Sequence, residues 1–334
     1  MATYKKQRYL LMTTDPVHIG TGGYRLGRVD NSIVREPGTR IPKIPGTSLH
    51  GAARSYAAQL YETPEAAGQD QDEVKNPELN PVCYTFGYIK KTKDGHEEKT
   101  IAYSGVVNIF DAHILLFPVH SMAGPVWVST PDRLRDAGYT VDSMPAEWDT
   151  DSVLLTWNRK DPLNLGWLMV NVVGQVCVTA PADWAENDRW KAMKNRIAVV
   201  QDALFSQVVN SNLEVRTSVA IDPKRGAAED KALFTYEAIP RATFLTMEVV
   251  LDDYRNGNSN RPFPKDKTAK DNPLPGGEWK GPLDVVKAGL EMIGWLGVGG
   301  MGTRGFGRMA IVGDPISRNF GKSNVKPNEA EVSP

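Results

Sequence analysis

A long irregular segment near the start of this 334-residue chain constrains its fold more than any other feature. Residues 18–46 mix glycines and prolines with scattered arginines, so no single helix or strand can run through them. A helix pattern follows directly, because Leu49, Ala53 and Leu60 recur at helical spacing. Long loops in compact domains usually carry function, so we expect this segment to form part of a binding or catalytic site.

Short apolar runs and a second helix pattern fill the rest of the chain. The runs 215–221 and 233–236 flank a basic segment, which predicts a β-hairpin. Lys224 and Arg225 would lie at its tip. Residues 283–296 again have helical spacing. Because strands alternate irregularly with helices, the sequence favours an α+β fold over a regular βαβ series.

The sequence predicts one large domain. Residues 1–316 contain all the helix and strand patterns, whereas residues 317–334 have the composition of a loose C-terminal tail. Residues 62–82 are acidic and rich in proline, glutamine and asparagine, which predicts a mobile insertion. The hairpin is expected to occupy about residues 210–245.

The charge distribution indicates an anionic partner, although the net charge of the chain is only −1. Residues 1–61 carry nine basic side chains against three acidic ones, an excess of +6, whereas residues 62–82 carry a net charge of −5. A local basic excess is what phosphate binding requires. A nucleic-acid partner is therefore one interpretation of residues 1–61, and a solvated charged surface is the other.

Several classes of protein are excluded by composition. No apolar run approaches the roughly 18 residues that cross a bilayer. The apolar run behind the basic N-terminus is too short for a signal peptide. Only Cys83 and Cys177 are present, so neither a disulfide framework nor a thiolate metal cluster is expected. The expected location is the cytoplasm.

Two glycine-rich loops are candidates for close contact with a ligand. The first contains His18, Gly20 and Gly22, and its flexible backbone amides can follow a sugar–phosphate chain. The second, residues 297–302, satisfies G-x-G-x-x-G. It lies between a helix and a following strand, which is the wrong order for a dinucleotide-binding fold. We interpret this second loop as a polyanion-binding loop or, alternatively, as a tight turn.

The junction between the irregular loop and the first helix is a third candidate. Thr47 or Ser48 can cap that helix. The free amides at its N-terminus, the Ser48 hydroxyl and Arg54 can together hold a phosphate. His50 and Arg54, four residues apart, share one helix face.

Taken together, these motifs resemble the signature of the RAMP superfamily of CRISPR proteins. Within it, the chain is most similar to the backbone subunit of type III complexes of the Cmr (III-B) kind. The resemblance is specific because several unrelated motifs occur in the expected order. The matching blocks are 18–22, 27–36, 44–54, 104–129, 215–244 and 299–307.

The resemblance implies an RRM-like (ferredoxin-like) palm, a β-hairpin thumb, long loop insertions and assembly with other Cas subunits in a filament along a guide RNA. It also implies cleavage of complementary single-stranded target RNA with a divalent metal ion, for which Mg²⁺ is the expected choice. Asp30 matches the family's aspartate, as catalytic residue and metal ligand. The residues expected to contact RNA are His18, Gly20, Gly22, Arg28, Lys43, Ser48, His50, Arg54, Lys224, Arg225, Gly299, Gly300 and Arg304.

The chemistry of RNA cleavage suits a carboxylate at Asp30. Attack by the 2′-hydroxyl needs in-line geometry, partial deprotonation and stabilisation of charge on the phosphate. One carboxylate can hold a divalent cation or accept the proton, and nearby arginines can stabilise the charge. A turn or capping carboxylate is the alternative interpretation of Asp30.

Other hypotheses stay open beside this one. The chain can be a structural guide-RNA-binding subunit without cleavage of its own. A guide-processing nuclease of the same superfamily would need a catalytic histidine, and His18 is the only histidine in a predicted loop. Asp111 and His113 would share one strand face as a metal pair, although apolar neighbours favour a satisfied pair in the core.

Overall fold

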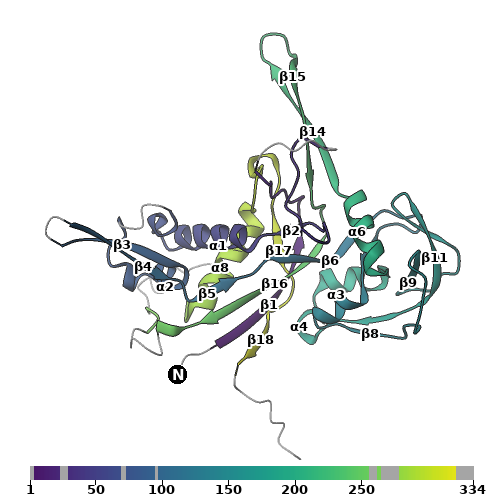
Figure 1. Cartoon of the computed structure of the whole chain (residues 1–334), viewed down its shortest axis with the longest axis horizontal. Helices are drawn as coiled ribbons and strands as arrows, with labels where there is room; N and C mark the ends of the chain where they lie inside the picture. Colours follow the sequence, from purple (N-terminus) through teal and green to yellow (C-terminus); the bar gives the residue numbers. More distant parts are fainter. Residues whose placement is uncertain are drawn as a thin grey trace, which may run out of the picture.

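The computed structural model describes residues 4–22, 29–68, 73–94, 97–255, 262–264 and 278–320. Its centre is a mixed sheet of twelve strands (Figure 1). These strands are β1 (Tyr4–Thr13), β2 (Lys43–Ile44), β5 (Val107–Ile109), β6 (Ala112–Val119), β7 (Val126–Ser129), β9 (Ser152–Leu155), β10 (Leu163–Leu165), β11 (Leu168–Gln175), β13 (Ile197–Val199), β16 (Phe244–Asp252), β17 (Met309–Ile311) and β18 (Ile316–Asn319).

The spatial order of the sheet is β10-β11-β9-β13-β7-β6-β16-β1-β17, with β18 beside β1, β2 beside β6 and β5 beside β16. The pairs β11–β9 and β13–β7 are parallel, and the pairs around β1 and β16 are antiparallel. The α+β prediction is therefore confirmed as a mixed fold built on one large mixed sheet.

Strand β1 organises the sheet because both of its faces are buried. Successive side chains of a strand point to opposite faces. Tyr9 and Leu11 accordingly join the larger hydrophobic core on one side, and Leu10 joins a second core on the other. All three side chains are almost fully buried.

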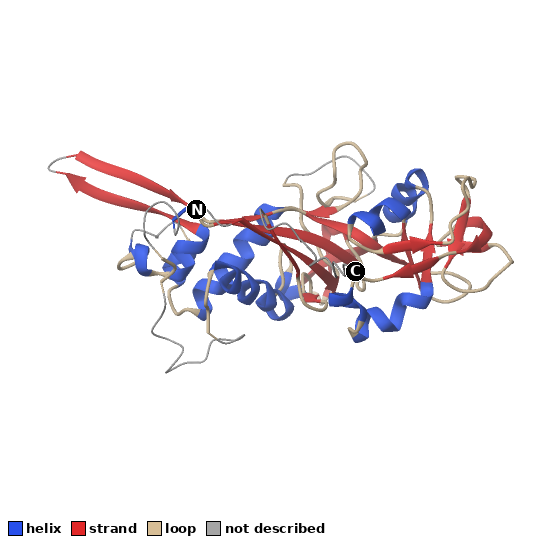
Figure 2. Ribbon diagram, turned by 90° about the horizontal axis from the view of Figure 1, so that it is seen from below, coloured by secondary structure: helices blue, strands red, loops and turns tan. Residues whose placement is uncertain are grey.

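Helices α1 (Gly46–Leu60) and α8 (Pro282–Leu296) cover the face of the sheet that carries Tyr9. The two helices pack closely against one another at Gly289, which has no Cβ. A Cβ added there would overlap the carbonyl oxygen of Ala53. The strands run through the middle of the molecule, with helices packed beside them (Figure 2).

A second lobe covers the opposite core. Its interior contains Tyr139, Trp184 and Trp190, packed with Leu10 of the central strand. The elements of this region are α3 (Pro131–Asp136), β8 (Thr140–Asp142), β12 (Cys177–Thr179), α4 (Ala182–Ala185), α5 (Asp188–Met193), η4 (Lys194–Arg196) and α6 (Asp202–Ser211). Helix α6 packs on the first core instead, through Phe205.

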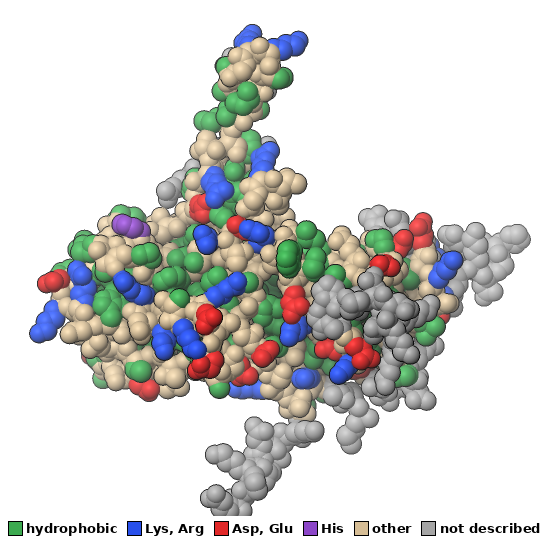
Figure 3. All heavy atoms as spheres, turned by 180° about the vertical axis from the view of Figure 1, so that it is seen from behind, with side chains coloured by type: hydrophobic (Ala, Val, Ile, Leu, Met, Phe, Trp, Pro, Cys, Tyr) green, Lys and Arg blue, Asp and Glu red, His purple; other side chains and the backbone are tan. Residues whose placement is uncertain are grey.

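Two β-ribbons project from this body (Figure 1). Strands β14 (Glu214–Asp222) and β15 (Ala227–Ala238) form the hairpin that the sequence predicted. Basic side chains lie at the end of this projection (Figure 3). The second ribbon, β3 (Gly87–Asp94) with β4 (Glu97–Ser104), was not predicted.

The remaining short elements bear on two predicted boundaries. The region 62–82 contains η1 (Pro64–Ala67), η3 (Pro77–Leu79) and the start of α2 (Pro81–Phe86), with Ala66 buried in the core; its predicted mobility stays a prediction. Strand β18 pairs with β1 as far as Asn319, so the sheet includes the first three residues of the predicted tail, and residues 321–334 of that tail lie outside the described residues. Within the described residues, no helix is long and apolar enough to cross a membrane.

Candidate nucleic-acid interface

The two glycine-rich loops meet in space. The backbone amide of Gly300 donates to the carbonyl oxygen of His18 over 2.9 Å. Gly299 has a φ of +89°, and a Cβ there would lie 2.5 Å from the same oxygen. Only glycine combines this backbone conformation with such close approach. The structure thus brings together two glycine-rich loops that are far apart in the sequence.

The side chain of His18 faces the protein rather than solvent. It is buried, and its Nδ1 donates to the backbone carbonyl oxygen of Glu237 over 2.7 Å. Its ring also lies edge-on to Tyr236. His18 therefore ties the first loop to β15, while Gly20 and Gly22 stay exposed beside it.

Asp30 lies at the base of the projecting hairpin. Both the backbone amide and the hydroxyl of Thr235 donate to its Oδ2, over 2.7 and 2.8 Å. These hydrogen bonds, the amide's first and then the hydroxyl's, lower the pKa of Asp30 below its ordinary value. The residue is exposed and ionised at neutral pH. Arg28, predicted to bind RNA nearby, lies outside the described residues.

A buried ion pair anchors the same loop. The Nη2 atom of Arg35 lies 2.5 Å from Oε2 of Glu237, and both side chains are largely buried. The amide of Ile33 donates to the same carboxylate oxygen over 3.2 Å, and Arg35 Nε donates to Asn210. Breaking a buried pair of this kind is costly. Glu237 was missed because no local pattern marks the partner of a distant arginine.

Cations and aromatic rings gather at the hairpin base. The guanidinium of Arg216 lies 4.7 Å from the ring centre of Phe306, and that of Arg304 lies 5.6 Å from the ring centre of Phe234. Tyr236 packs edge-on against Phe306. Stacking rings beside cations suit a nucleic acid. Arg216 was not predicted, although an exposed basic residue on a hairpin strand was a possible signal.

The helix N-terminus does not form the predicted phosphate site. The Oδ1 atom of Asp111 accepts the amide of Gly46 over 2.7 Å, and the amide of Ser48 donates to Pro45 over 3.0 Å. A carboxylate already occupies the positive end of α1, and it would repel a phosphate there. The structure therefore gives no support to the phosphate site predicted around Ser48, and its contact with RNA stays a prediction.

Lys43 is likewise engaged within the fold. Its Nζ lies 2.9 Å from Glu36 Oε1 and 2.6 Å from Asp111 Oδ2. Hydrogen bonds to Asp111 and then to Glu36 raise the pKa of Lys43. Its charge neutralises two carboxylates, so the structure gives no support to its predicted contact with RNA.

His50 and Arg54 share a helix face as predicted, but that face packs inside the molecule. Arg54 donates from Nε to the carbonyl of Ala66 and from Nη2 to that of Gly87, each over 2.9 Å. The His50 ring lies edge-on to Phe86, and burial, followed by the charge of Arg54, lowers its pKa. Because both side chains contact neighbouring elements, the structure gives no support to their predicted role as a phosphate-binding pair, which stays a prediction.

Lys224 and Arg225 lie at the hairpin tip, as predicted, and both are exposed. The turn is held by Asp222, whose Oδ1 accepts the amide of Lys224 over 2.8 Å. The tip projects away from the glycine loops (Figure 1). Lys224 and Arg225 therefore form a basic patch at the hairpin tip that is separate from the surface around Asp30.

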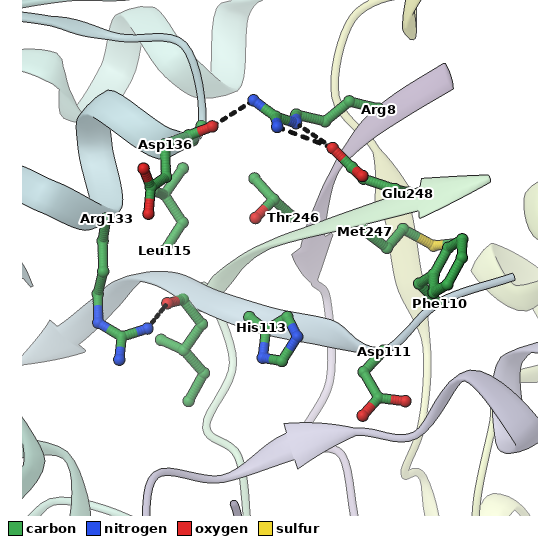
Figure 4. Close-up of a pocket in the computed structure, with 12 residues that line it drawn as sticks. Arg8, Phe110, Asp111, His113, Leu115, Arg133, Asp136, Thr246, Met247 and Glu248 are labelled. Carbon is green, nitrogen blue, oxygen red and sulfur yellow. Dashed lines mark hydrogen bonds and ion pairs between the residues drawn. The ribbon is translucent and has the colours of Figure 1, made fainter. Parts of the chain in front are cut away.

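A groove of about 400 Å³ lies elsewhere, between β6, β16, β1 and α3 (Figure 4). Two of its charged side chains pair with one another: Arg8 donates to Glu248 over 2.7 Å and also to the carbonyl of Asp136. Arg133 donates to the carbonyl of Ile114. Among the described residues, none that was predicted to bind RNA lines this groove.

One group of described residues has the composition of a metal site. Glu36, Asp111 and His113 each present a ligand atom, and these atoms lie within 4.8 Å of one another. Lys43 contacts both carboxylates, so its ammonium supplies the positive charge. Asp111 contacts Lys43, and Nδ1 of His113 lies 3.6 Å from Glu36 Oε1, so the two residues have separate partners. Both are partly exposed, whereas the sequence had led us to expect them in the core.

Comparison with known proteins gives one consistent family. Residues 10–310 match the RAMP superfamily. The chain is 28% identical to the CRISPR system Cmr endoribonuclease Cmr4 of Pyrococcus furiosus over 249 residues, which cover 70% of this chain and 77% of that protein. It is 39% identical to the CRISPR system Cms endoribonuclease Csm3 of Mycobacterium tuberculosis over 51 residues, 15% of this chain and 22% of that protein.

Solved structures show the same fold. A type III-B Cmr-beta complex bound to cognate target RNA contains a chain that matches with a TM-score of 0.56 at 13% identity, covering 92% of this chain and 96% of that one. Oligomeric Cmr4 from Pyrococcus furiosus matches with a TM-score of 0.53 at 22% identity, covering 95% of this chain and 99% of that one.

Proposed function

This chain belongs to the RAMP superfamily, and from that premise we propose that it is an RNA-binding backbone subunit of a type III CRISPR effector complex. In this proposal it holds guide RNA and cleaves complementary single-stranded target RNA in the cytoplasm. Its partners are other Cas subunits and neighbouring copies or paralogues in a filament. The similarity to a Cmr endoribonuclease over 70% of the chain supports the assignment.

The order of the central strands supports an RRM-like palm. Strands β17-β1-β16-β6 are neighbours in that order, α1 lies between β1 and β6 in the chain, and α8 lies between β16 and β17. This is the β-α-β-β-α-β arrangement of a ferredoxin-like unit with long insertions. On this basis the β14–β15 hairpin is the thumb, and its base carries the surface that contacts RNA.

The observation that carries the nuclease proposal is the placement of Asp30. An exposed, ionised carboxylate lies at the hairpin base, within a surface that also carries the paired glycine loops. Such a carboxylate can accept the proton of an attacking 2′-hydroxyl. Arg216, exposed on β14 beside Glu214, and Arg304, exposed in the second glycine loop, are the described cations of this region that would stabilise charge on the phosphate.

Asp30 also fits a magnesium ion as a single protein ligand. Mg²⁺ prefers oxygen ligands and is commonly held by one or two carboxylates together with substrate phosphates. Asp30 is exposed, and no group of three potential ligands includes it within the described residues. RNA oxygens and water would therefore complete its coordination. When bound, the ion would neutralise negative charge on the phosphate.

One observation favours a structural RNA-binding subunit instead. The Asp30 carboxylate accepts two hydrogen bonds from Thr235, so it can act as a clamp between the loop and the hairpin. In that case the charge of Asp30 would have no chemical role. The variant Asp30→Asn separates the two functions, because asparagine keeps an oxygen for Thr235 and removes the charge.

The test uses the complete effector complex, assembled with guide RNA from wild-type or Asp30→Asn subunits. We expect the variant complex to capture complementary target RNA with unchanged affinity. Its cleavage rate should fall by about 100-fold or more, because the lost charge acts on the transition state. Removal of divalent metal with a chelator should abolish cleavage by the wild type. Cleavage by the Asp30→Asn complex at the wild-type rate would contradict the nuclease function and leave the structural RNA-binding function as the remaining one.

A further inference from the structure

We infer that Thr235 is the residue that positions the Asp30 carboxylate for cleavage, an inference that rests on the nuclease function proposed above. Thr235 lies in β15, close to the end of the strand that is remote from the hairpin turn. It would act through Asp30 and make no contact with RNA itself.

The two residues form a closed set of three hydrogen bonds. The Thr235 amide donates to Asp30 Oδ2 over 2.7 Å, and its hydroxyl donates to the same oxygen over 2.8 Å. The Asp30 amide in turn donates to the Thr235 hydroxyl oxygen over 3.1 Å. A hydroxyl group has one hydrogen to donate and lone pairs to accept, so this pattern fully defines its orientation.

This arrangement makes the two carboxylate oxygens of Asp30 different. Oδ2 accepts both donors of Thr235, whereas Oδ1 accepts no hydrogen bond from any described residue. Oδ1 is therefore the oxygen that can take a proton or meet a cation. By holding Oδ2, Thr235 fixes the direction in which Oδ1 points.

The backbone around the pair is held independently of the threonine side chain. The Asn31 amide donates to the Thr235 carbonyl over 3.0 Å, and the Glu237 amide donates to the Asn31 carbonyl over 3.2 Å. These bonds set the loop alongside β15 in a parallel bridge between Asn31 and Tyr236. Loss of the hydroxyl should therefore change the orientation of Asp30 without releasing the loop.

A functional consequence follows for the hairpin. Because the donor to Asp30 is part of β15, any displacement of the hairpin base moves the catalytic oxygen as well. The position of the hairpin base would thus determine the orientation of the Asp30 carboxylate, in addition to shaping the RNA. The cleavage rate should depend on this position even where RNA affinity does not.

The experiment compares effector complexes that contain Thr235→Val, Thr235→Ser or Thr217→Val in single-turnover cleavage of bound target RNA. Valine has the shape of threonine but lacks the hydroxyl, whereas serine keeps the hydroxyl. Thr217 lies directly opposite Thr235 in the hairpin and makes no hydrogen bond to Asp30 within the described residues, so it is the matched control.

We expect Thr235→Val to bind target RNA normally and to cleave it about tenfold more slowly or worse. Thr235→Ser and Thr217→Val should retain the wild-type rate. Retention of the rate with serine, but not with valine, would assign the effect to the hydroxyl rather than to the packing of the side chain.

The outcomes separate this inference from the function on which it rests. If Thr235→Val cleaves at the wild-type rate while Asp30→Asn is inactive, the inference is wrong and the nuclease function stands. Failure of Thr235→Val to assemble would give the residue a structural role and would also overturn the inference. If Asp30→Asn itself cleaves normally, the nuclease function fails instead.

Discussion

The backbone amide of Gly300 and the carbonyl oxygen of His18 are joined by a hydrogen bond of 2.9 Å, so loops from opposite ends of the chain form one surface. The side chain of His18 is buried against β15, and the exposed part of the surface is therefore largely backbone. A backbone surface with flexible glycines favours a partner that is recognised by its sugar–phosphate chain rather than by its sequence.

Replacing Gly299 with alanine should disrupt this junction. Its φ of +89° is strained for alanine, and the new Cβ would meet the His18 carbonyl. Gly305, with a φ of +82° and open space around it, is the matched control for the strain alone. We expect Gly299→Ala to lower both the thermal unfolding midpoint and guide-RNA affinity more than Gly305→Ala. Equal effects of the two variants would show that the loop contact contributes nothing.

Replacing Arg54 with alanine should weaken the fold rather than RNA binding. The variant leaves two half-buried carbonyl groups without their donors, which should cost about 1–3 kcal/mol in urea unfolding. The salt dependence of RNA binding should not change. Arg304→Ala, at an exposed guanidinium, should instead lower the single-strand salt slope by about 0.7. A lower salt slope of RNA binding for Arg54→Ala would show that Arg54 contacts RNA after all.

Deleting residues 222–230 should separate hairpin function from folding. The remaining strands keep their register from Glu214–Ala238 to Val219–Leu233, and the deleted tip contributes no residue to the described hydrophobic cores. We expect an unchanged thermal unfolding midpoint, retained guide binding and strongly impaired target cleavage in the assembled complex. Normal cleavage would show that the hairpin is not a thumb that distorts the target RNA.

The Glu248 ion pairs should contribute stability that disappears in acid. Burial opposes ionisation of Glu248, but hydrogen bonds from Arg8 and Lys6 outweigh it and lower its pKa below the ordinary 4.5. Its contribution is therefore present above about pH 4.5 and is lost as the pH falls through the lowered value. Glu248→Gln should cost about 1 kcal/mol at pH 7. The gap to wild type in urea midpoints should narrow as the pH falls below 4.5; a gap independent of pH would contradict the ion pair.

The two cysteines should differ strongly in reactivity. Burial raises the pKa of the Cys83 thiol to about 11, whereas Cys177 is exposed. The thiolate is the reactive form, so Cys83 should resist alkylation in the folded protein at pH 8. Mass spectrometry of Cys177→Ser should find no label until the protein is unfolded, and Cys83→Ser should label at once. Rapid labelling of Cys83 would show that its region opens readily.

Local patterns in the sequence were sufficient to predict several elements correctly. The helical spacing of Leu49 and Ala53 placed α1, and the basic tip between two apolar runs placed the β14–β15 hairpin. The order of the motifs also predicted membership of the RAMP superfamily, which is confirmed. These features succeed because periodicity, turn chemistry and motif order lie within short stretches of chain.

The sequence by itself therefore determined the main helices, the β14–β15 hairpin, the family and the candidate aspartate, whereas only the tertiary structure decided which side chains are available. Asp111, 65 positions along the chain from Gly46, occupies the helix end that had suggested a phosphate site. Thr235, 205 positions from Asp30, supplies the donors to its carboxylate. Spacing identifies the face on which a side chain lies, but its hydrogen-bond partner is set by packing between segments distant in sequence, and no local pattern encodes that packing.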